Sequence, residues 1–242
     1  MTLFPRELSL TLCPDRAVLR RRTGRDEVLF EGAGPGLLPE HYSSRLAALA
    51  EKPAFLEAPL RVLVSDAWVR YDRVPVAAGP LSGEDALQLA HARFLKNYGA
   101  PHWPMRVAAF RDGLLTAGLE PELLAALEEL AAERKLRLTG IEPLFCRLLD
   151  QAASGLAHFT GWLLADEEDL FVLAFLENGH PVEIRSQYRQ GERNTAALAL
   201  LERQAALSSR PERAVRCYAL SGIPLRLPAP WEVDNKPLLA GL

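Results

Sequence analysis

The chain has 242 residues, of which 49% are hydrophobic and 24% charged, a composition typical of a soluble globular protein with one or two domains. Its net charge of −3 argues against a general nucleic-acid binder, and no window approaches eighteen uncharged apolar residues, so no membrane span is expected. The start carries Arg6 and Glu7 where a signal peptide needs an apolar block, and the three cysteines lie far apart. We therefore expect a cytoplasmic protein with reduced thiols.

Residues 8–64 have the pattern of an antiparallel meander that leads into a helix and a buried strand. Short strands are expected at 8–13, 17–22 and 27–30, with turn residues between them. Helical spacing predicts a helix over 41–52, and the apolar run 60–64 predicts a strand buried on both faces. Three strands, a helix and a strand in this order resemble the opening of a ribonuclease-H-like unit.

Over residues 67–98 the pattern of polar and apolar residues changes from strand-like alternation to helical spacing. Polar and apolar residues alternate over 67–75, which predicts a half-exposed strand with Trp68 and Arg70 on the same side. Residues 83–98 predict a helix that begins after a serine N-cap and ends before a glycine. The apolar residues expected on the inward face of this helix are Leu87, Ala90, Phe94 and Leu95.

A hairpin and a helix–strand–helix unit follow. The predicted segments are strands 105–110 and 114–119, helix 121–135, strand 136–141 and helix 144–153. The Asp-Gly pair between the first two strands is a strong hairpin signal. We interpret residues 1–157 as the first half of the fold, with residues 66–119 as a small α+β insertion within it.

A second meander begins near residue 161. The predicted segments are strand 161–165, a turn at Asp166–Asp169, strand 170–176, an Asn178-Gly179 turn and strand 180–187. The seven consecutive apolar residues 170–176 contribute on the order of 10 kcal/mol when buried, at ~1.5–3 kcal/mol per large side chain, so this strand is expected inside a sheet. A helix over 195–207 and a strand over 215–220 complete the same order of elements as in the first half.

We interpret residues 158–222 as a second, shorter half and residues 223–242 as a Pro-rich tail. The prolines of this tail enforce extended structure, and Trp231 is an apolar residue on a segment that cannot form a core of its own. The tail either folds back onto the body or docks on a partner. Folding back is favoured, because an exposed tryptophan together with two exposed leucines, Leu238 and Leu239, would be a liability.

Two such halves resemble the actin-like ATPase superfamily and, within it, the pilus-assembly protein M type and the cytoplasmic domain of the type II secretion protein L. The resemblance is carried by Val62–Pro75, with an R-x-x-x-x-P pattern that starts at Arg70, by the Leu119–Pro143 unit ending in GIEP, and by the hairpin Gly161–Gln187. It implies an α/β fold of two ribonuclease-H-like halves, with an insertion in the first and a truncated second half. It also implies a scaffold under the inner membrane that recruits or aligns pilus or secretion components.

The sequence departs from this resemblance where active members bind nucleotide. Those members hold the phosphates with an Asp-x-Gly turn at the start of each half, because glycine lets backbone amides approach phosphate closely. Here the turns are Cys13–Arg16 and Asp166–Asp169, neither of which has a glycine, and Pro14 removes an amide donor. A late Gly-Gly turn for adenine is also missing. We therefore expect no bound cofactor and no ATP hydrolysis.

Carboxylates near strand ends leave an enzymatic alternative open. Ribonuclease-H-like nucleases hold Mg²⁺ with acids gathered from separate strands, whereas those of Asp166–Asp169 are consecutive, so a solvated turn is the favoured interpretation of that segment. The alternative function is a nucleotide-binding ATPase or phosphotransferase, or a nuclease of the same superfamily. Its acids would be Asp15, Asp66 and Asp166. An α/β domain with another binding role also stays open.

The sequence thus predicts a non-catalytic scaffold, with no catalytic, cofactor-binding or metal-binding residue. The expected partners are proteins, including inner-membrane assembly components through which the chain would be held near the membrane, and an oligomer is compatible with the sequence. Nucleic acid and direct membrane insertion are not expected. The residues predicted to face a partner are Trp68, Arg70 and Trp231, because tryptophan and arginine are frequent at interface hot spots.

Overall fold

The computed structural model describes residues 8–14, 16–21, 27–31, 59–76, 82–99, 103–110, 113–133, 135–167 and 169–237. The predicted helix over 41–52 lies outside these residues. The chain divides into two compact units, the first made of Met1–Arg70, Phe94–Arg106 and Ala117–Leu144 and the second of Tyr71–Arg93, Val107–Thr116 and Phe145–Leu242. The division cuts through the predicted insertion, whose strands and helix contribute residues to both units.

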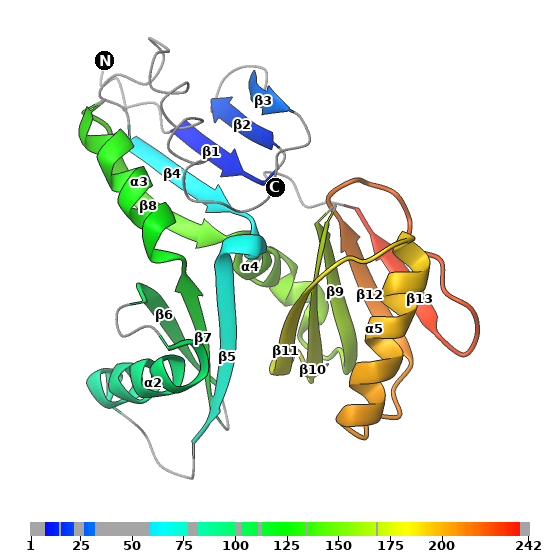
Figure 1. The fold of residues 1–242 in the computed structure, drawn as a ribbon. Coiled ribbons are helices and arrows are strands. Elements are labelled where there is room, and N and C mark those ends of the chain that lie inside the picture. The colour runs from blue at the N-terminus through cyan, green and yellow to red at the C-terminus, as the bar shows by residue number, and fades with distance from the viewer. Residues whose placement is uncertain are drawn as a thin grey trace. The chain divides into compact units, whose positions relative to one another are not determined.

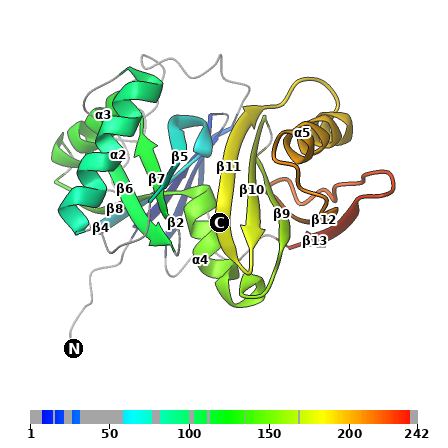
Figure 2. The ribbon, with the colours of Figure 1, turned by 90° about the horizontal axis from the view of Figure 1, so that it is seen from below.

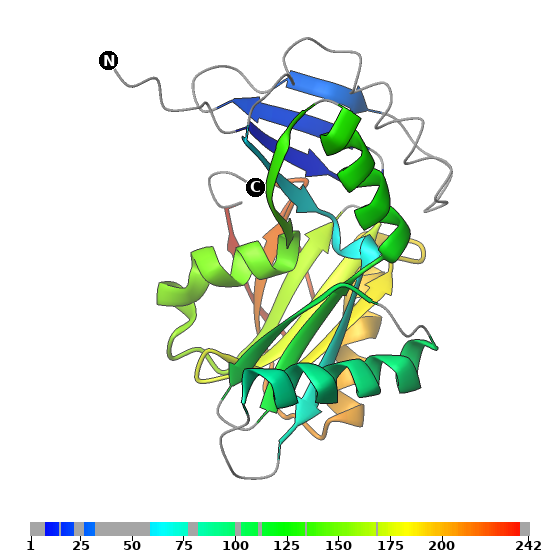
Figure 3. The same ribbon diagram turned by 90° about the vertical axis from the view of Figure 1, so that its left-hand side faces the viewer.

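The first five-stranded sheet has the order β3-β2-β1-β4-β8. Its strands are β1 (Leu8–Leu12), β2 (Arg16–Arg21), β3 (Glu27–Glu31), β4 (Pro59–Val64) and β8 (Arg137–Pro143). β1 to β3 form the predicted antiparallel meander, and β1, β4 and β8 run parallel. Helix α3 (Pro121–Glu133) packs against β8 with its buried leucine stripe (Figure 3). The apolar run predicted as a buried strand is β4, whose Val62 and Val64 are fully buried.

A three-stranded sheet of order β5-β7-β6 carries helix α2 (Gly83–Tyr98) on one face (Figure 3). Its strands are β5 (Val69–Pro75), β6 (Met105–Phe110) and β7 (Gly113–Leu119). The predicted helix bounds are confirmed, and Gly99 follows them with a left-handed φ of 71°. The predicted inward face is wrong for Leu87 and Leu95, which are 40% and 49% exposed. It is correct for Ala90 and Phe94, which are 0% and 1% exposed, and Ala86, which was not predicted, is buried beside them.

The second five-stranded sheet repeats the order and orientations of the first, as β11-β10-β9-β12-β13. Its strands are β9 (Gly161–Glu167), β10 (Leu170–Glu177), β11 (His180–Tyr188), β12 (Ala214–Ala219) and β13 (Glu232–Lys236). Helix α5 (Arg193–Leu207) covers one face of this sheet and α4 (Leu144–Leu156) the other (Figures 1 and 2). Every residue of 170–176 is at most 4% exposed, which confirms the prediction of an interior strand. The Asn178-Gly179 turn is confirmed by left-handed φ angles of 50° and 80°.

Residues 220–231 connect β12 to the parallel strand β13, which the sequence analysis did not predict. In the first sheet the corresponding connection contains helix α3, whereas this one has no helix or strand. Leu225 and Trp231 from the connection are 1% and 6% exposed and pack into the core under α5. The expectation that the tail folds back is therefore confirmed for these residues, while Leu238 and Leu239 lie outside the described part of the chain.

Candidate functional site

The most strongly organised polar site lies where β9 ends and α5 begins. β9 places Trp162 and Leu164 in the core under α5, so strand alternation puts Asp166 on the same face. Arg193 is the first residue of α5, and its Nε donates a hydrogen bond to Asp166 Oδ2. The two side chains are only 2% and 12% exposed. The site is therefore a buried ion pair between a strand end and a helix start.

The same pair fastens the connection that follows β12. Arg193 Nη1 donates to the Pro224 carbonyl at 3.0 Å, and the Leu220 amide donates to the Asp166 carbonyl at 2.9 Å. Asn194, the next residue of α5, accepts a hydrogen bond from the Arg226 amide at 3.0 Å. Two adjacent side chains at the start of α5 thus fix a segment that has no helix or strand of its own.

Burial dominates the electrostatics of this site. It raises the pKa of Asp166, and the hydrogen bond and positive charge of Arg193 oppose that shift. One oxygen of the carboxylate, Oδ1, and one nitrogen of the guanidinium, Nη2, are buried with no hydrogen-bond partner in the described part of the chain. Cys217 lies nearby, and burial, together with the charge of Asp166, raises the pKa of its thiol to about 12. Neither the carboxylate nor the thiol is exposed for chemistry on a substrate.

The N-terminus of α5 is closed by its own cap. Glu192 accepts hydrogen bonds from the amides of Asn194 and Thr195 at 3.0 Å and 2.8 Å and from the Thr195 hydroxyl at 2.9 Å. These bonds lower the pKa of the Glu192 carboxyl. Because first-turn amides already bind a carboxylate, they are not available to an external anion.

The described amides of the β1–β2 turn in the first unit also have partners within the turn. The Cys13 amide donates to the Arg16 carbonyl at 2.8 Å, and the Arg16 amide donates to the Cys13 carbonyl at 3.3 Å. Pro14 has no amide hydrogen, and Asp15 lies outside the described residues. The described amides of this turn therefore point at one another.

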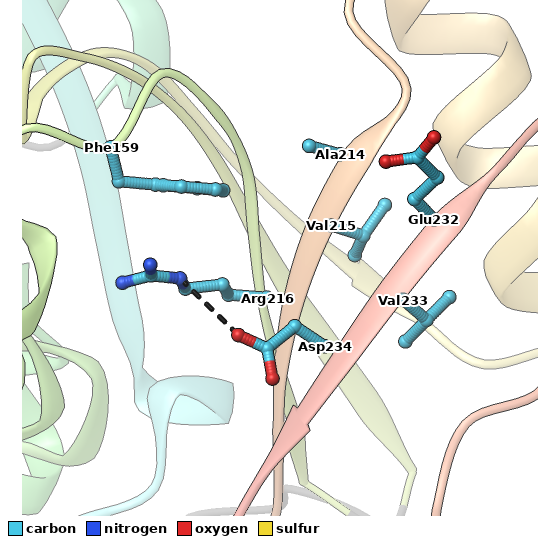
Figure 4. A pocket seen from close by; sticks show the side chains of 7 residues that line it. All are labelled: Phe159, Ala214, Val215, Arg216, Glu232, Val233 and Asp234. Atoms are coloured by element: carbon cyan, nitrogen blue, oxygen red, sulfur yellow. Dashed lines mark ion pairs between the residues drawn. The ribbon is translucent and has the colours of Figure 1, made fainter.

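A shallow groove of about 350 Å³ lies on the α4 face of the second sheet, near the beginnings of β12 and β13 (Figure 4). One wall is the Arg216 guanidinium stacked under the Phe159 ring, 4.4 Å from the ring centroid. Arg216 also donates to the Gly155 carbonyl and lies 3.6 Å from an Asp234 carboxylate oxygen. The groove brings a cation, an aromatic ring and the carboxylates of β13 together, with no nucleophile among its lining residues.

Two of the three residues predicted to face a partner are buried. Trp68 is 3% exposed, because Asp66–Trp68 form a single 3₁₀ turn, η2, that directs the ring inward instead of extending the alternating strand. Trp231 packs in the core under α5, with the Arg213 guanidinium 4.7 Å above its ring. The predictions that Trp68 and Trp231 face a partner are therefore wrong, because both side chains are buried. Arg70 is half-buried, and its Nη1 donates to the Ala67 and Val69 carbonyls at 3.2 Å and 3.3 Å.

The acidic residues singled out by the sequence also differ from expectation. Asp166 and Glu167 are 2% and 6% exposed, so the predicted solvated turn is wrong for them, whereas the Asp169 side chain is well exposed and Glu168 lies outside the described residues. The reason is that β9 continues through both residues before the chain turns. Asp66 is 1% exposed. Among the described residues, no group of three histidine, cysteine or acidic side chains is placed to hold a metal ion.

Sequence reasoning missed Arg193 and Arg216, the two cations on which these sites depend. Each is one of 28 lysines and arginines, and neither belongs to a motif with a fixed spacing. Arg193 could have been noticed as a charged residue at the start of a helix, where a positive side chain is unfavourable unless an acid lies close by. Arg216 interrupts an apolar strand, which is a comparable signal.

Comparison with solved structures identifies the fold. No protein family and no curated protein matches the sequence. A chain of the PilM–PilN type IV pilus biogenesis complex superposes with a TM-score of 0.61 at 13% identity, over 89% of this chain and 81% of that one. A Bacteroides thetaiotaomicron protein of unknown function with an actin-like ATPase fold gives 0.59 at 13% identity, over 90% and 84%.

A third structure is similar over almost the whole chain. The cytoplasmic domain of EpsL, an inner-membrane component of the type II secretion system of Vibrio cholerae, gives a TM-score of 0.57 at 12% identity, over 98% of this chain and 90% of that one. The chain has the α/β fold of the actin-like ATPases, as its sequence resemblance predicted. At these identities the likeness establishes the fold alone.

Proposed function

We propose that this protein is a non-catalytic scaffold of a type IV pilus or type II secretion-like assembly. Two of the similar structures come from such systems, one from a pilus biogenesis complex and one from an inner-membrane secretion component. The proposed partners are proteins of the assembly. The proposed link to the inner membrane runs through such a partner. No helix in the described part of the chain is long and apolar enough to cross a membrane.

The observation that carries the non-catalytic part of the proposal is the Asp166–Arg193 pair. The actin-like ATPase fold implies a nucleotide, whose phosphates carry several negative charges. At the end of β9 such a group would meet the buried carboxylate of Asp166, to which the Arg193 guanidinium is already bound. Asp166 therefore already has its cation, supplied by the chain itself.

The backbone at both meander turns supports the same conclusion. The described amides of the β1–β2 turn are paired with each other, and Pro14 contributes none. The β9–β10 turn has no glycine, so side chains keep a polyphosphate away from its amides. The residues present thus do not fit a nucleotide, and we derive no reaction step through one.

The enzymatic alternative has less support. A ribonuclease-H-like nuclease or a phosphotransferase needs carboxylates that reach a metal or substrate, whereas Asp66 and Asp166 are 1% and 2% exposed.

Of the three residues that the sequence predicted to face a partner, we still propose Arg70, because its side chain is only half-buried.

Affinity purification of the chain from its native cells, with quantitative mass spectrometry, tests the scaffold. Enrichment of inner-membrane components of one pilus or secretion assembly is expected, and an Arg70→Ala variant should recover less of its direct partner. A matched control is Arg203→Ala, which removes an exposed arginine from α5, far along the helix from its buried start. Recovery of no assembly component by the wild-type chain would contradict the proposal.

A further inference from the structure

Strand β13 forms one outer edge of the second sheet. Its hydrogen-bonded neighbour is β12, and no strand of the described residues pairs with its other side (Figure 1). The sequence of β13 is Glu-Val-Asp-Asn-Lys, flanked by the buried Trp231 and by Pro237. An edge strand offers a row of backbone donors and acceptors to another strand.

The backbone of β13 alternates between its two sides. The Glu232 amide donates to the Arg213 carbonyl at 2.9 Å, so residue 232 faces β12. Because successive residues of a strand direct their amide and carbonyl groups to opposite sides, Asp234 and Lys236 also face β12, whereas Val233 and Asn235 face outward. The outer edge therefore has two outward donors and two outward acceptors, from residues 233 and 235.

The side chains of β13 alternate between the faces of the sheet. Val233 packs against the core under α5, and the Asn235 amide group exchanges two hydrogen bonds with the Leu225 backbone, at 2.8 Å and 3.0 Å. Glu232 and Asp234 line the groove (Figure 4), and strand alternation puts Lys236 on the same face, with its Nζ 2.7 Å from an Asp234 carboxylate oxygen. This face thus has the charge order negative, negative, positive along the edge.

We propose that β13 pairs with β13 of a second copy of this chain, antiparallel, around a two-fold axis at Asp234. In this register Val233 lies opposite Asn235 of the second copy, and the same pair occurs again across the axis. Both residues face outward, so the pairing makes four backbone hydrogen bonds. Glu232 then lies opposite Lys236 of the second copy, also twice, which joins opposite charges across the strands.

The like charges that meet at the axis are already compensated. Each Asp234 has Lys236 Nζ of its own chain at 2.7 Å and Arg216 Nε at 3.6 Å. Two neighbouring registers also place outward-facing residues opposite each other, but both are less favourable than the register centred on Asp234. Moving the axis to Val233 places Glu232 opposite Asp234, and moving it to Asn235 places Val233 opposite Pro237, which has no amide hydrogen.

The inference concerns a second copy and does not depend on the proposed scaffold function. A five-residue strand pair buries less surface than a standard interface, so we expect association that is weak and concentration-dependent. It extends two five-stranded sheets into one continuous sheet across the axis, an isologous arrangement in which each copy uses the same patch.

Sedimentation velocity of the full chain over rising concentration tests the pairing. The wild type is expected to shift from monomer to dimer as the concentration rises. Glu232→Lys or Lys236→Glu should weaken dimerisation at least about tenfold, because each change puts like charges at residues 232 and 236 of the two copies, on both sides of the axis. The double variant E232K/K236E restores opposite charges across the strands in the same register and should dimerise more tightly than either single variant, but more weakly than the wild type, because Asp234 loses its ion pair with Lys236 at the axis. Thermal melts of all three variants establish that they remain folded.

Hydrogen exchange supplies a second readout at the level of single amides. The Val233 and Asn235 amides should exchange freely at low concentration and become protected at high concentration, while the Asp234 amide is protected throughout. Val233→Pro removes one outward donor without touching the bonds to β12 and should abolish the dimer. A wild type that stays monomeric throughout, or single charge variants that dimerise like the wild type, would overturn the proposal.

Discussion

Replacing Asp166 by alanine should destabilise the protein far more than its single carboxylate suggests. The change leaves the Arg193 guanidinium, 12% exposed, without its acid, and breaking a buried ion pair in this way costs about 3–5 kcal/mol. For a chain of this size each kcal/mol lowers Tm by roughly 2–4 °C, so a shift of roughly 6–20 °C is expected. Urea denaturation followed by circular dichroism measures the change in unfolding free energy.

Two further variants distinguish the cost of breaking the buried ion pair from the cost of simply shortening a side chain. The double change Asp166→Leu with Arg193→Met removes both charges together, and we expect it to cost only about 1 kcal/mol, for the lost hydrogen bond to the Pro224 carbonyl. Asp169→Ala is the matched control, since that carboxylate is 78% exposed and its bond to Arg189 is 3.5 Å long, so a cost below about 1 kcal/mol is expected. A D166A variant no less stable than D169A would refute the reasoning.

The cap and the core thiol provide two more predictions. Glu192 has a lowered pKa in the folded chain, so its contribution to stability is present above its unfolded pKa of 4.5 and is lost as the pH falls through the folded value. The Tm difference between wild type and Glu192→Gln should therefore shrink in acid, and a difference independent of pH would contradict the cap. Burial raises the pKa of Cys217 to about 12, so iodoacetamide at pH ~8 should label the half-buried Cys146 first and Cys217 only after unfolding, as peptide mass mapping would detect. Equal labelling rates in the native protein would show that Cys217 is not buried.

Local signals in the sequence were enough to predict much of the fold. The hairpin at Asn178-Gly179 and the apolar strand β10 were both correct, because turn residues and a continuous apolar run determine structure without reference to distant segments. The bounds of α2 were also correct, since a serine N-cap and Gly99 mark its ends. The repeated order of strands was visible for the same reason.

The predictions that were wrong or missing concern features that depend on contacts between residues distant in the sequence. β13 is polar and short, and its pairing with β12 cannot be inferred from either segment alone. The inward face of α2 was predicted too broadly: Ala90 and Phe94 are buried, but Leu87 and Leu95 lie on the neighbouring apolar stripe, which the sheet leaves exposed. Trp68 was misplaced since a single 3₁₀ turn at residues 66–68 shifts the phase of the strand that follows.

The candidate site was the least predictable feature. The missing glycines of both turns were apparent from the sequence, but the acid at Asp166 looked like part of a solvated turn. Its burial follows from the extension of β9 by two residues and from Arg193, which lies 27 positions later in the chain. No spacing rule links a strand end to a helix start across an intervening hairpin.

The central claim is that the chain's own side chains and turn amides leave no place for a polyphosphate. Isothermal titration calorimetry with Mg²⁺ and ATP tests it most directly. Injection of ATP up to ~1 mM into the 242-residue chain should give only the heat of dilution, which corresponds to a Kd weaker than ~1 mM. A saturable isotherm with a Kd in the micromolar range would contradict it.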